Sequence, residues 1–327
     1  MTTVVPAVGI MLPRDLDASR VIEFARRAEA LGFAELWVVE DLPFRGGIAQ
    51  AAVVLAATER IHVGIGILPA VARNVVFATM EIATLATLFP GRLTVGVGHG
   101  MPEWMRQAGD WPASPLSALG ETLDVMRALL RGEAVTTAGR YVRVDGVRLN
   151  DVPTIPPLVL AGVRGPKSLA LSGRSADGTV LAEPVTPEYL AAALAQIDTD
   201  REHRIVAYNV GAVASTAAAA RKLARPALEW IGEPDWAPHI APLPFADEFR
   251  EFRASVNREE FARTMPDDWV DALAVVGTAE MARARLEELG RAGAHCVVLI
   301  PAGEPFAALE ALAETATRIE LVETSQT

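Results

Sequence analysis

The segment best suited to bind an anion is residues 162–168, which read Gly-Val-Arg-Gly-Pro-Lys-Ser and follow a short apolar run. Proline suits the first turn of a helix, because the N–H that it lacks has no partner there. The remaining free N–H groups of a helix N-terminus attract negative charge, and two cations stand beside them here. We therefore predict a phosphate cradle made by Gly162, Val163, Arg164, Gly165, Pro166 and Lys167.

A second glycine-rich segment, residues 96–100, reads Gly-Val-Gly-His-Gly. Glycine lets the backbone approach a ligand closely, so we expect Gly98, His99 and Gly100 to contact the same anion. The alternative is a plain tight turn from a strand into a helix. His99 is also the one histidine expected at the carboxyl end of a strand beside glycines, which makes it a candidate proton carrier.

Two adjacent carboxylates, Glu40 and Asp41, stand at the end of the strand expected over residues 35–40. Like charges at one site favour retention of a proton by one of them, so either could act as an acid or base. The alternative is that Asp41 caps the next helix. Residues 64–69 read Gly-Ile-Gly-Ile-Leu-Pro, and glycine inside a strand indicates a bulge or a closely packed ligand.

Short apolar runs alternate with amphipathic stretches along the chain. The strands expected from the apolar runs cover residues 4–12, 35–40, 61–68, 92–98, 158–161, 178–182, 204–213 and 295–300, and the helices cover residues 17–31, 48–57, 74–88, 116–130, 166–171, 187–197, 216–230, 279–290 and 305–321. Repeated strand–helix steps without a flexible linker predict an α/β fold, a (β/α)₈ TIM barrel with insertions at its C-terminal mouth. A doubly wound sheet is the alternative, but residues 11–15 lack its glycine-rich fingerprint.

Two segments interrupt the alternation. Residues 133–150 carry a hairpin signal, and residues 231–270, rich in proline and tryptophan, are expected to form an irregular helical insertion. The chemistry of such a barrel lies at the carboxyl ends of its strands. Trp104, Trp111 and Trp236 are therefore candidates to line a substrate pocket, with core or lid packing as the alternative.

The composition excludes several classes of protein. A net charge of −11 with the two signs mixed along the chain argues against a nucleic-acid partner. The single cysteine, Cys296, rules out an internal disulfide and fits a reducing compartment. No apolar stretch approaches the ~20 residues of a membrane helix and no secretion signal is seen, so we expect a cytoplasmic protein without a membrane partner. No histidine pair has metal-ligand spacing, and no metal is expected.

Taken in order, several segments resemble the bacterial luciferase-like superfamily and, within it, the coenzyme F420-dependent oxidoreductases of the methylenetetrahydromethanopterin reductase type. They are residues 32–38 (GFAELWV), 56–64 (AATERIHVG), 80–85 (MEIATL), 90–92 (PGR), 165–169 (GPKSL), 176–178 (ADG) and 276–278 (VGT). Each match is weak alone, but their order makes the resemblance strong across nearly the whole chain. It implies a single luciferase-like barrel domain over residues 1–327.

The resemblance implies a flavin-like ring lying against a bulge in the third strand, with a non-prolyl cis peptide at Gly66–Ile67. It also implies a cofactor phosphate near residues 98–100 and 162–165, and it favours coenzyme F420 over FMN. Family members often carry Asp-His or Glu-His-His after the second strand. This chain has Glu40-Asp41 without a histidine, which leaves His99 or Glu40 to take the place of the usual proton donor.

The resemblance further implies transfer of a hydride between a reduced deazaflavin and a small organic substrate. Two alternatives stay open: an FMNH₂-dependent monooxygenase that uses oxygen, and a non-catalytic flavin-binding barrel. Relatives are usually dimers, so we expect a homodimer. The expected binding partner is a small-molecule substrate.

Overall fold

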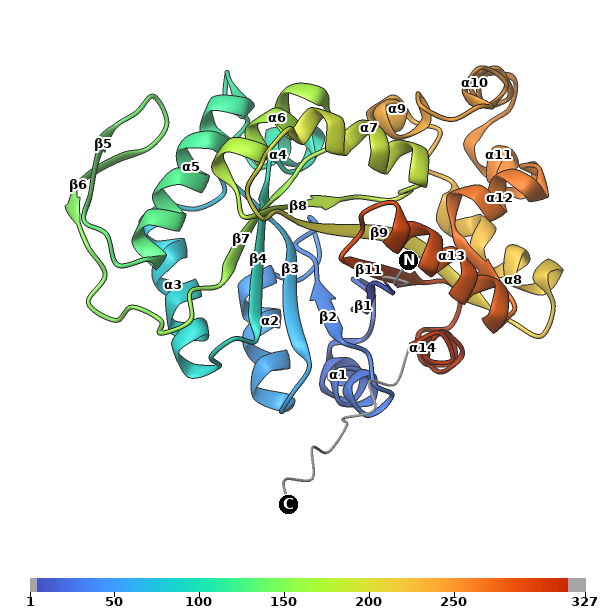
Figure 1. Ribbon diagram of the computed structural model, residues 1–327, viewed down its shortest axis with the longest axis horizontal. Coiled ribbons are helices and arrows are strands. Elements are labelled where there is room, and N and C mark those ends of the chain that lie inside the picture. The colour runs from blue at the N-terminus through green and yellow to red at the C-terminus, as the bar shows by residue number, and fades with distance from the viewer. Residues whose placement is uncertain (1–4, 317–327) are drawn as a thin grey trace.

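Eight parallel strands form the centre of the molecule in this computed structural model, which describes residues 5–316 (Figure 1). In chain order they are β1 (Ala7–Met11), β2 (Glu35–Val38), β3 (His62–Pro69), β4 (Leu93–Gly98), β7 (Leu158–Gly162), β8 (Gly178–Leu181), β9 (Arg204–Val213) and β11 (Cys296–Pro301). They pair in the order β9-β11-β1-β2-β3-β4-β7-β8, and β8 pairs again with β9. The sheet is therefore a closed barrel, and the predicted (β/α)₈ TIM barrel is confirmed.

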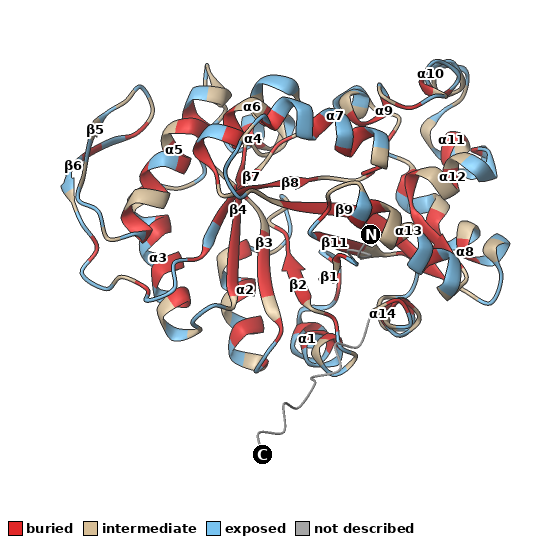
Figure 2. Ribbon diagram, in the orientation of Figure 1, coloured by how far each residue is buried: buried red, intermediate tan, exposed pale blue. Residues whose placement is uncertain are grey.

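The strands are buried along nearly their whole length because helices cover their outer faces (Figure 2). A parallel sheet covered in this way has continuous apolar strands rather than alternating ones. The helices are α1 (Val21–Ala30) after the short η1 (Ala18–Arg20), α2 (Gly47–Ala57), α3 (Val75–Leu88), α4 (Pro102–Gln107), α5 (Pro115–Leu130), α6 (Pro166–Ser175), α7 (Pro187–Ile197), α8 (Ala217–Ala224), α13 (Ala279–Arg291) and α14 (Pro305–Ala313). The helix expected over residues 305–321 is shorter in the structure, because α14 ends at Ala313. The expected strand start at Val4 and residues 317–321 lie outside the described residues.

Two insertions lie at opposite ends of the molecule (Figure 1). The hairpin pairs β5 (Val135–Ala138) antiparallel with β6 (Arg143–Val147). The other insertion comprises η2 (Arg225–Leu228), η3 (Pro234–Trp236), α9 (Ala237–Ile240), α10 (Ala246–Ser255), α11 (Arg258–Thr264) and α12 (Asp267–Leu273). These helices pack around a second apolar cluster, which includes Phe249 and Phe261 and extends to residues of β9 and α8.

An additional strand, β10 (Val275–Gly277), pairs with the last residues of β9. β10 is not among the predicted strands, because a three-residue apolar run is too short to show a period. β9 is long enough to pair with β8 and β11 within the barrel and to extend beyond them to β10. In this way β9 joins the barrel to the helical insertion.

Aromatic rings fill the barrel interior. The rings of Trp37 on β2 and Tyr208 on β9 meet edge to face, with centroids 5.9 Å apart. Because β2 and β9 are not neighbours in the sheet, this contact crosses the barrel. A methyl group at Gly64 would overlap the Trp37 indole, and one at Gly66 would overlap the Tyr208 hydroxyl. The glycines of β3 therefore make room for these rings.

An ion pair crosses the barrel near the amino ends of its strands. Glu35 on β2 accepts hydrogen bonds from Arg204 on β9 and from Nε1 of Trp37, the latter at 2.8 Å. Only 4% of Glu35 is exposed. His62 and His295 lie at this same end of the barrel, as the sequence predicts, away from the mouth.

Candidate active site

A bulge in β3 shapes the floor of the mouth. The pairing of β3 with β4 shifts register between Ile65 and Leu68, and the Gly66–Ile67 peptide is cis, as the resemblance implies. A methyl group at Gly162 would overlap the Ile67 side chain, and one at Gly98 would come within 3.1 Å of it. Ile67 thus lies across the ends of β4 and β7, and the glycines there make room for it.

The N-terminus of α6 opens beside this floor. Gly165 is the N-cap residue and Pro166 occupies the first turn. Nε2 of His99, just past β4, lies 2.9 Å from Oγ of Ser168, so the two predicted anion-binding segments are joined. A Cβ atom built at Gly165 would meet nothing within 4 Å. A side chain at this position would therefore extend into space that the protein does not fill.

The two predicted cations beside the helix differ in their surroundings. The Arg164 guanidinium donates to the carbonyl of Asp235 at 3.2 Å and lies over the Trp236 ring, 4.9 Å from its centre. Lys167 is exposed and has no hydrogen bond or ion pair with another residue in the range 5–316. Arg164 therefore ties the helical insertion to the mouth, while Lys167 is the cation free to meet an incoming anion.

The adjacent carboxylates Glu40 and Asp41 turn toward different partners. Glu40 accepts two hydrogen bonds from the Arg73 guanidinium, both at 2.6 Å, and one from the Gly47 N–H at 2.7 Å. Asp41 accepts from Arg14 at 2.9 Å. The first N–H of α2 is thus capped by Glu40 and not by Asp41. Glu40 joins the β3–α3 loop to α2, and every hydrogen bond found for it is structural.

His99 lies where a proton carrier was expected, but its surroundings favour the neutral ring. Burial lowers the pKa of His99. Its Nδ1 atom is buried and has no hydrogen-bond partner among the described residues. A neutral imidazole beside Ser168 can orient a polar ligand, but it is not charged near neutral pH.

Two residues that sequence reasoning missed face the mouth. Glu183 follows β8, and burial raises the pKa of its carboxyl. The hydroxyl of Tyr208 is buried without a partner among the described residues, and burial raises its pKa well above the usual value. The rule that selected Glu40, an acid just past a strand, applies equally to Glu183. Tyr208 lies inside a strand, so no such rule points to it.

The helical insertion docks against the mouth through two buried rings. His239 on α9 stacks against Tyr189 on α7, with ring centres 4.1 Å apart. The Tyr189 hydroxyl donates to the carbonyl of Arg164 at 3.1 Å. Nδ1 of His239 lies 3.1 Å from the carbonyl of Pro184, and because a carbonyl only accepts, the histidine donates. The insertion is therefore fixed to the loops after β7 and β8.

Lowering the pH from 7 to 5 should destabilise the fold by about 2 kcal/mol through His239 alone. Burial lowers the pKa of His239 to about 3 in the folded protein, whereas it is about 6.5 in an unfolded chain. The unfolded chain thus binds a proton that the folded protein does not. This stability is complete above about pH 6.5 and is lost as the pH falls toward the folded-state pKa.

Urea unfolding between pH 5 and 7, for the natural chain and for His239→Phe, measures this contribution. The variant should lose about 2 kcal/mol of the pH dependence, even if its stability at pH 7 is lower. Equal pH slopes for the two proteins would contradict the prediction.

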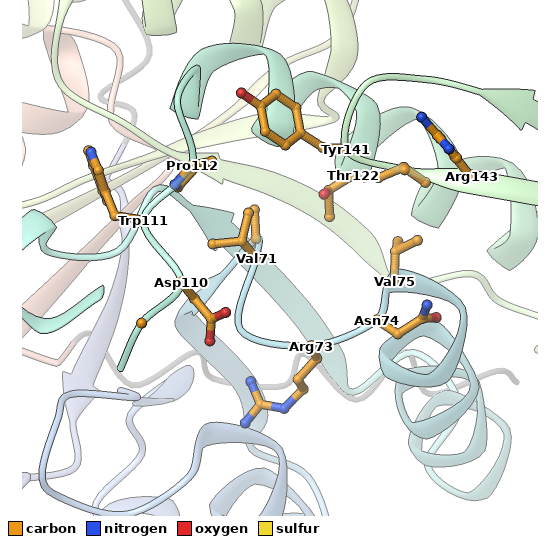
Figure 3. A pocket seen from close by; sticks show the side chains of 13 residues that line it. Val71, Arg73, Asn74, Val75, Asp110, Trp111, Pro112, Thr122, Tyr141 and Arg143 are labelled. Atoms are coloured by element: carbon orange, nitrogen blue, oxygen red, sulfur yellow. The ribbon is translucent and has the colours of Figure 1, made fainter. Parts of the chain in front are cut away.

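The three predicted substrate-lining tryptophans do not share one pocket. Trp111 lines a cavity of about 370 Å³ with Arg73, Tyr141 and Arg143, between the β3–α3 loop and the hairpin. The Arg73 guanidinium points away from Tyr141 there (Figure 3). Trp104 is half-buried on α4, whereas Trp236 lies under Arg164 in the helical insertion. The tryptophans thus border the mouth at separate places.

Within residues 5–316 we find no group of three or more His, Cys, Asp or Glu side chains placed to hold a metal ion. None of the helices in this range combines the length and apolar composition needed to cross a lipid bilayer.

The sequence profile of the luciferase-like monooxygenases matches residues 3–296. The chain belongs to this family. A related sequence in the same family, the 5,10-methylenetetrahydromethanopterin reductase of Methanolobus tindarius, is 27% identical over 88% of this chain and 90% of its own length. The F420-dependent glucose-6-phosphate dehydrogenase of Beutenbergia cavernae is 34% identical over 51% of this chain and 52% of its own.

A solved family structure supports the same fold. The coenzyme F420-dependent tetrahydromethanopterin reductase of Methanopyrus kandleri superposes with a TM-score of 0.81 and 20% identity, covering 95% of this chain and 98% of that one. The oxygenating constituent of the 3,6-diketocamphane monooxygenase of Pseudomonas putida, solved with FMN, superposes with a TM-score of 0.71 and 15% identity, covering 96% and 98%. The luciferase-like fold thus accommodates both kinds of named protein and does not by itself select a cofactor.

Proposed function

We propose that this luciferase-like protein is an oxidoreductase that transfers a hydride between coenzyme F420 and a small organic substrate. The observation that carries the proposal is the β3 bulge with its cis Gly66–Ile67 peptide, beside the glycine-containing ends of β4 and β7 and near the N-terminus of α6. Among the relatives, those named as F420-dependent dehydrogenases support F420 rather than FMN.

The residues present fit such a cofactor. The open space at Gly165 and the exposed Lys167 suit an anionic tail at the start of α6, and His99 suits a polar contact beside it. The planar ring would lie against Gly66 and Ile67. Val163, Pro166 and the glycines at positions 98, 100 and 162 would shape the backbone around the tail. The bound deazaflavin supplies the hydride chemistry.

The protein's own contribution is to orient the substrate and exclude water, which contributes up to ~7–11 kcal/mol when reacting partners are well placed. Arg164, Trp236 and Tyr189 form a wall on the side of the helical insertion. On the other side, Trp111 lines the side cavity, and Trp104 lies half-buried on α4. We place the substrate between these walls, above the floor at Ile67.

We further propose that the barrel and its two insertions act as one domain, and that the protein works as a homodimer in the cytoplasm. Three apolar side chains on α3 are exposed, namely Phe77 (66%), Met80 (47%) and Leu88 (65%). These side chains lie on one helix, where a second copy of this chain could bury them in a dimer interface. The buried thiol of Cys296 is compatible with a reducing compartment.

Titration with oxidised F420 and with FMN, followed by cofactor fluorescence, tests the proposed cofactor. We expect F420 to bind at least about tenfold more tightly, a difference of about 1.4 kcal/mol. Turnover with reduced F420 and no oxygen would support hydride transfer. Product formed only with reduced FMN and oxygen would overturn the proposal in favour of a monooxygenase. Binding without turnover on any acceptor would favour a non-catalytic flavin-binding barrel.

A further inference from the structure

Glu183 occupies a rigid position at the mouth. It lies two residues past β8, and the backbone that follows it is fixed on both sides. The Asn209 side chain on β9 accepts from the N–H of Val185 at 3.0 Å and donates to its carbonyl at 3.1 Å. His239 holds the carbonyl of Pro184. A carboxyl on such a loop has a defined position before any ligand arrives.

Charged and polar groups from several strand ends face this carboxyl. Arg164 follows β7, Asp41 follows β2 and Arg14 follows β1, and all of them act on Glu183 electrostatically. Glu183 in turn acts on the Tyr208 hydroxyl on β9. Strands on different sides of the barrel contribute to this set, so Glu183 points into the mouth rather than outward.

Unlike the other acids of the mouth, Glu183 has no hydrogen-bond donor from another described residue. Glu40 is held by Arg73 and the Gly47 N–H, and Asp41 by Arg14. The residue is half-buried, and burial outweighs the nearby arginines and raises the pKa of its carboxyl. A carboxyl in such surroundings is suited to keep a proton and to donate it.

We propose that Glu183 is the catalytic acid, and that it donates its proton to the oxygen or nitrogen of a neutral carbonyl or imine substrate. This inference rests on the proposed function. The substrate carbon accepts the hydride, the C=O or C=N double bond becomes a single bond, and the heteroatom takes the proton of Glu183. The reduced deazaflavin is thereby oxidised by two electrons, and water reprotonates the carboxylate. In the reverse direction Glu183 is the base that accepts the proton from an alcohol or amine.

The other candidates fit this role less well. His99 is neutral and lies beside Ser168 at the start of α6, where the cofactor tail is placed. Glu40 is bound at both of its oxygens. Asp41 follows β2 and is the rival acid, but its carboxylate is held in an ion pair by Arg14.

Glu183→Gln tests the inference, with Glu188→Gln as the matched control because Glu188 is exposed on α7 five residues further along. The infrared spectrum of the cofactor-free protein should contain the C=O band of a protonated carboxylic acid. That band should be lost in Glu183→Gln and kept in the control. Circular dichroism checks that each variant is folded.

The kinetic assay uses reduced F420 with a panel of small ketones, aldehydes, enones and cyclic imines. We expect Glu183→Gln to lower kcat by about 10²–10⁴-fold, with F420 affinity within twofold of the natural chain. For the natural chain, kcat/KM should fall as the pH rises through the pKa of Glu183, and this limb should be absent in Glu183→Gln. Asp41→Asn should keep the limb.

The outcomes separate the two proposals. If the natural chain does not bind F420, the proposed function fails and the role of Glu183 fails with it. If it binds F420 but reduces no member of the panel, the substrate class is wrong. If the natural chain is active and Glu183→Gln keeps both its kcat and the fall of kcat/KM with rising pH, Glu183 is not the acid. The same holds if Asp41→Asn, and not Glu183→Gln, loses them. In either case the proposed function stands.

Discussion

Replacing Gly165 with valine should weaken cofactor binding by about 100-fold or more and leave the free energy of unfolding nearly unchanged. The backbone of Gly165 has φ −95° and ψ 157°, an extended conformation that valine also adopts. A Cβ atom there meets no protein atom within 4 Å, so the side chain fits the free protein. It would, however, fill the space through which a phosphate must reach the N–H groups of α6. Losing one or two charge-assisted hydrogen bonds, each contributing about 1.5–3 kcal/mol, gives an effect of this size.

The measurement is a pair of experiments on each variant, a fluorescence titration with oxidised F420 and a urea unfolding curve. Gly165→Ala should have an intermediate effect. Gly46→Ala is the control, because Gly46 is likewise an N-cap glycine in extended backbone, exposed at the start of α2. Unchanged F420 affinity in a folded Gly165→Val protein would show that the tail binds elsewhere.

Replacing Arg204 with methionine should lower the free energy of unfolding by about 3–5 kcal/mol. Glu35 is only 4% exposed, and its charge is balanced by Arg204 across the barrel. Removal of the cation leaves a buried carboxylate with the Trp37 N–H as its remaining side-chain donor. An uncompensated buried charge is costly, whereas an exposed ion pair contributes little.

Urea unfolding near neutral pH measures this loss. Arg174→Met is the control, because Arg174 is exposed on α6 and its side chain has no ion pair within the described part of the chain. The double variant Glu35→Gln with Arg204→Met should be more stable than Arg204→Met alone, since it removes the unbalanced charge. A loss below about 1 kcal/mol for Arg204→Met would mean that the pair behaves as a surface ion pair.

The barrel could be predicted because the pattern that produces it is local in the sequence and repeats along the chain. A covered parallel sheet needs apolar runs separated by amphipathic helices, and the sequence has that rhythm. The short strand β10 escaped prediction because three residues carry no period, and its place depends on the unusual length of β9. Likewise, the contact of Trp37 with Tyr208 joins residues far apart in the chain, and nothing in their local sequences indicates it.

The candidate site was predictable where backbone chemistry decides it. Glycines, a proline at the first turn of a helix and nearby cations identify the start of α6 from residue types alone. The sequence does not show which carboxylate lacks a hydrogen-bond donor, because the donors come from residues distant in the chain. Glu40 and Asp41 stood out as a pair, yet the arginines at positions 73 and 14 hold them. Glu183 also stands just past a strand, but its sequence does not show the burial that raises the pKa of its carboxyl, because that burial comes from the surrounding fold.

Ile67 rests on the glycines that end β4 and β7, while the loop after β8 is pinned by Asn209 and His239. Different residues therefore position the side of the mouth proposed to bind the cofactor tail and the side proposed to bind the substrate. A laboratory library confined to residues 231–270 would therefore be expected to yield enzymes with new preferences and an unaltered requirement for their redox partner. Within that range Asp235 and Trp236, which Arg164 contacts, are the positions to keep constant.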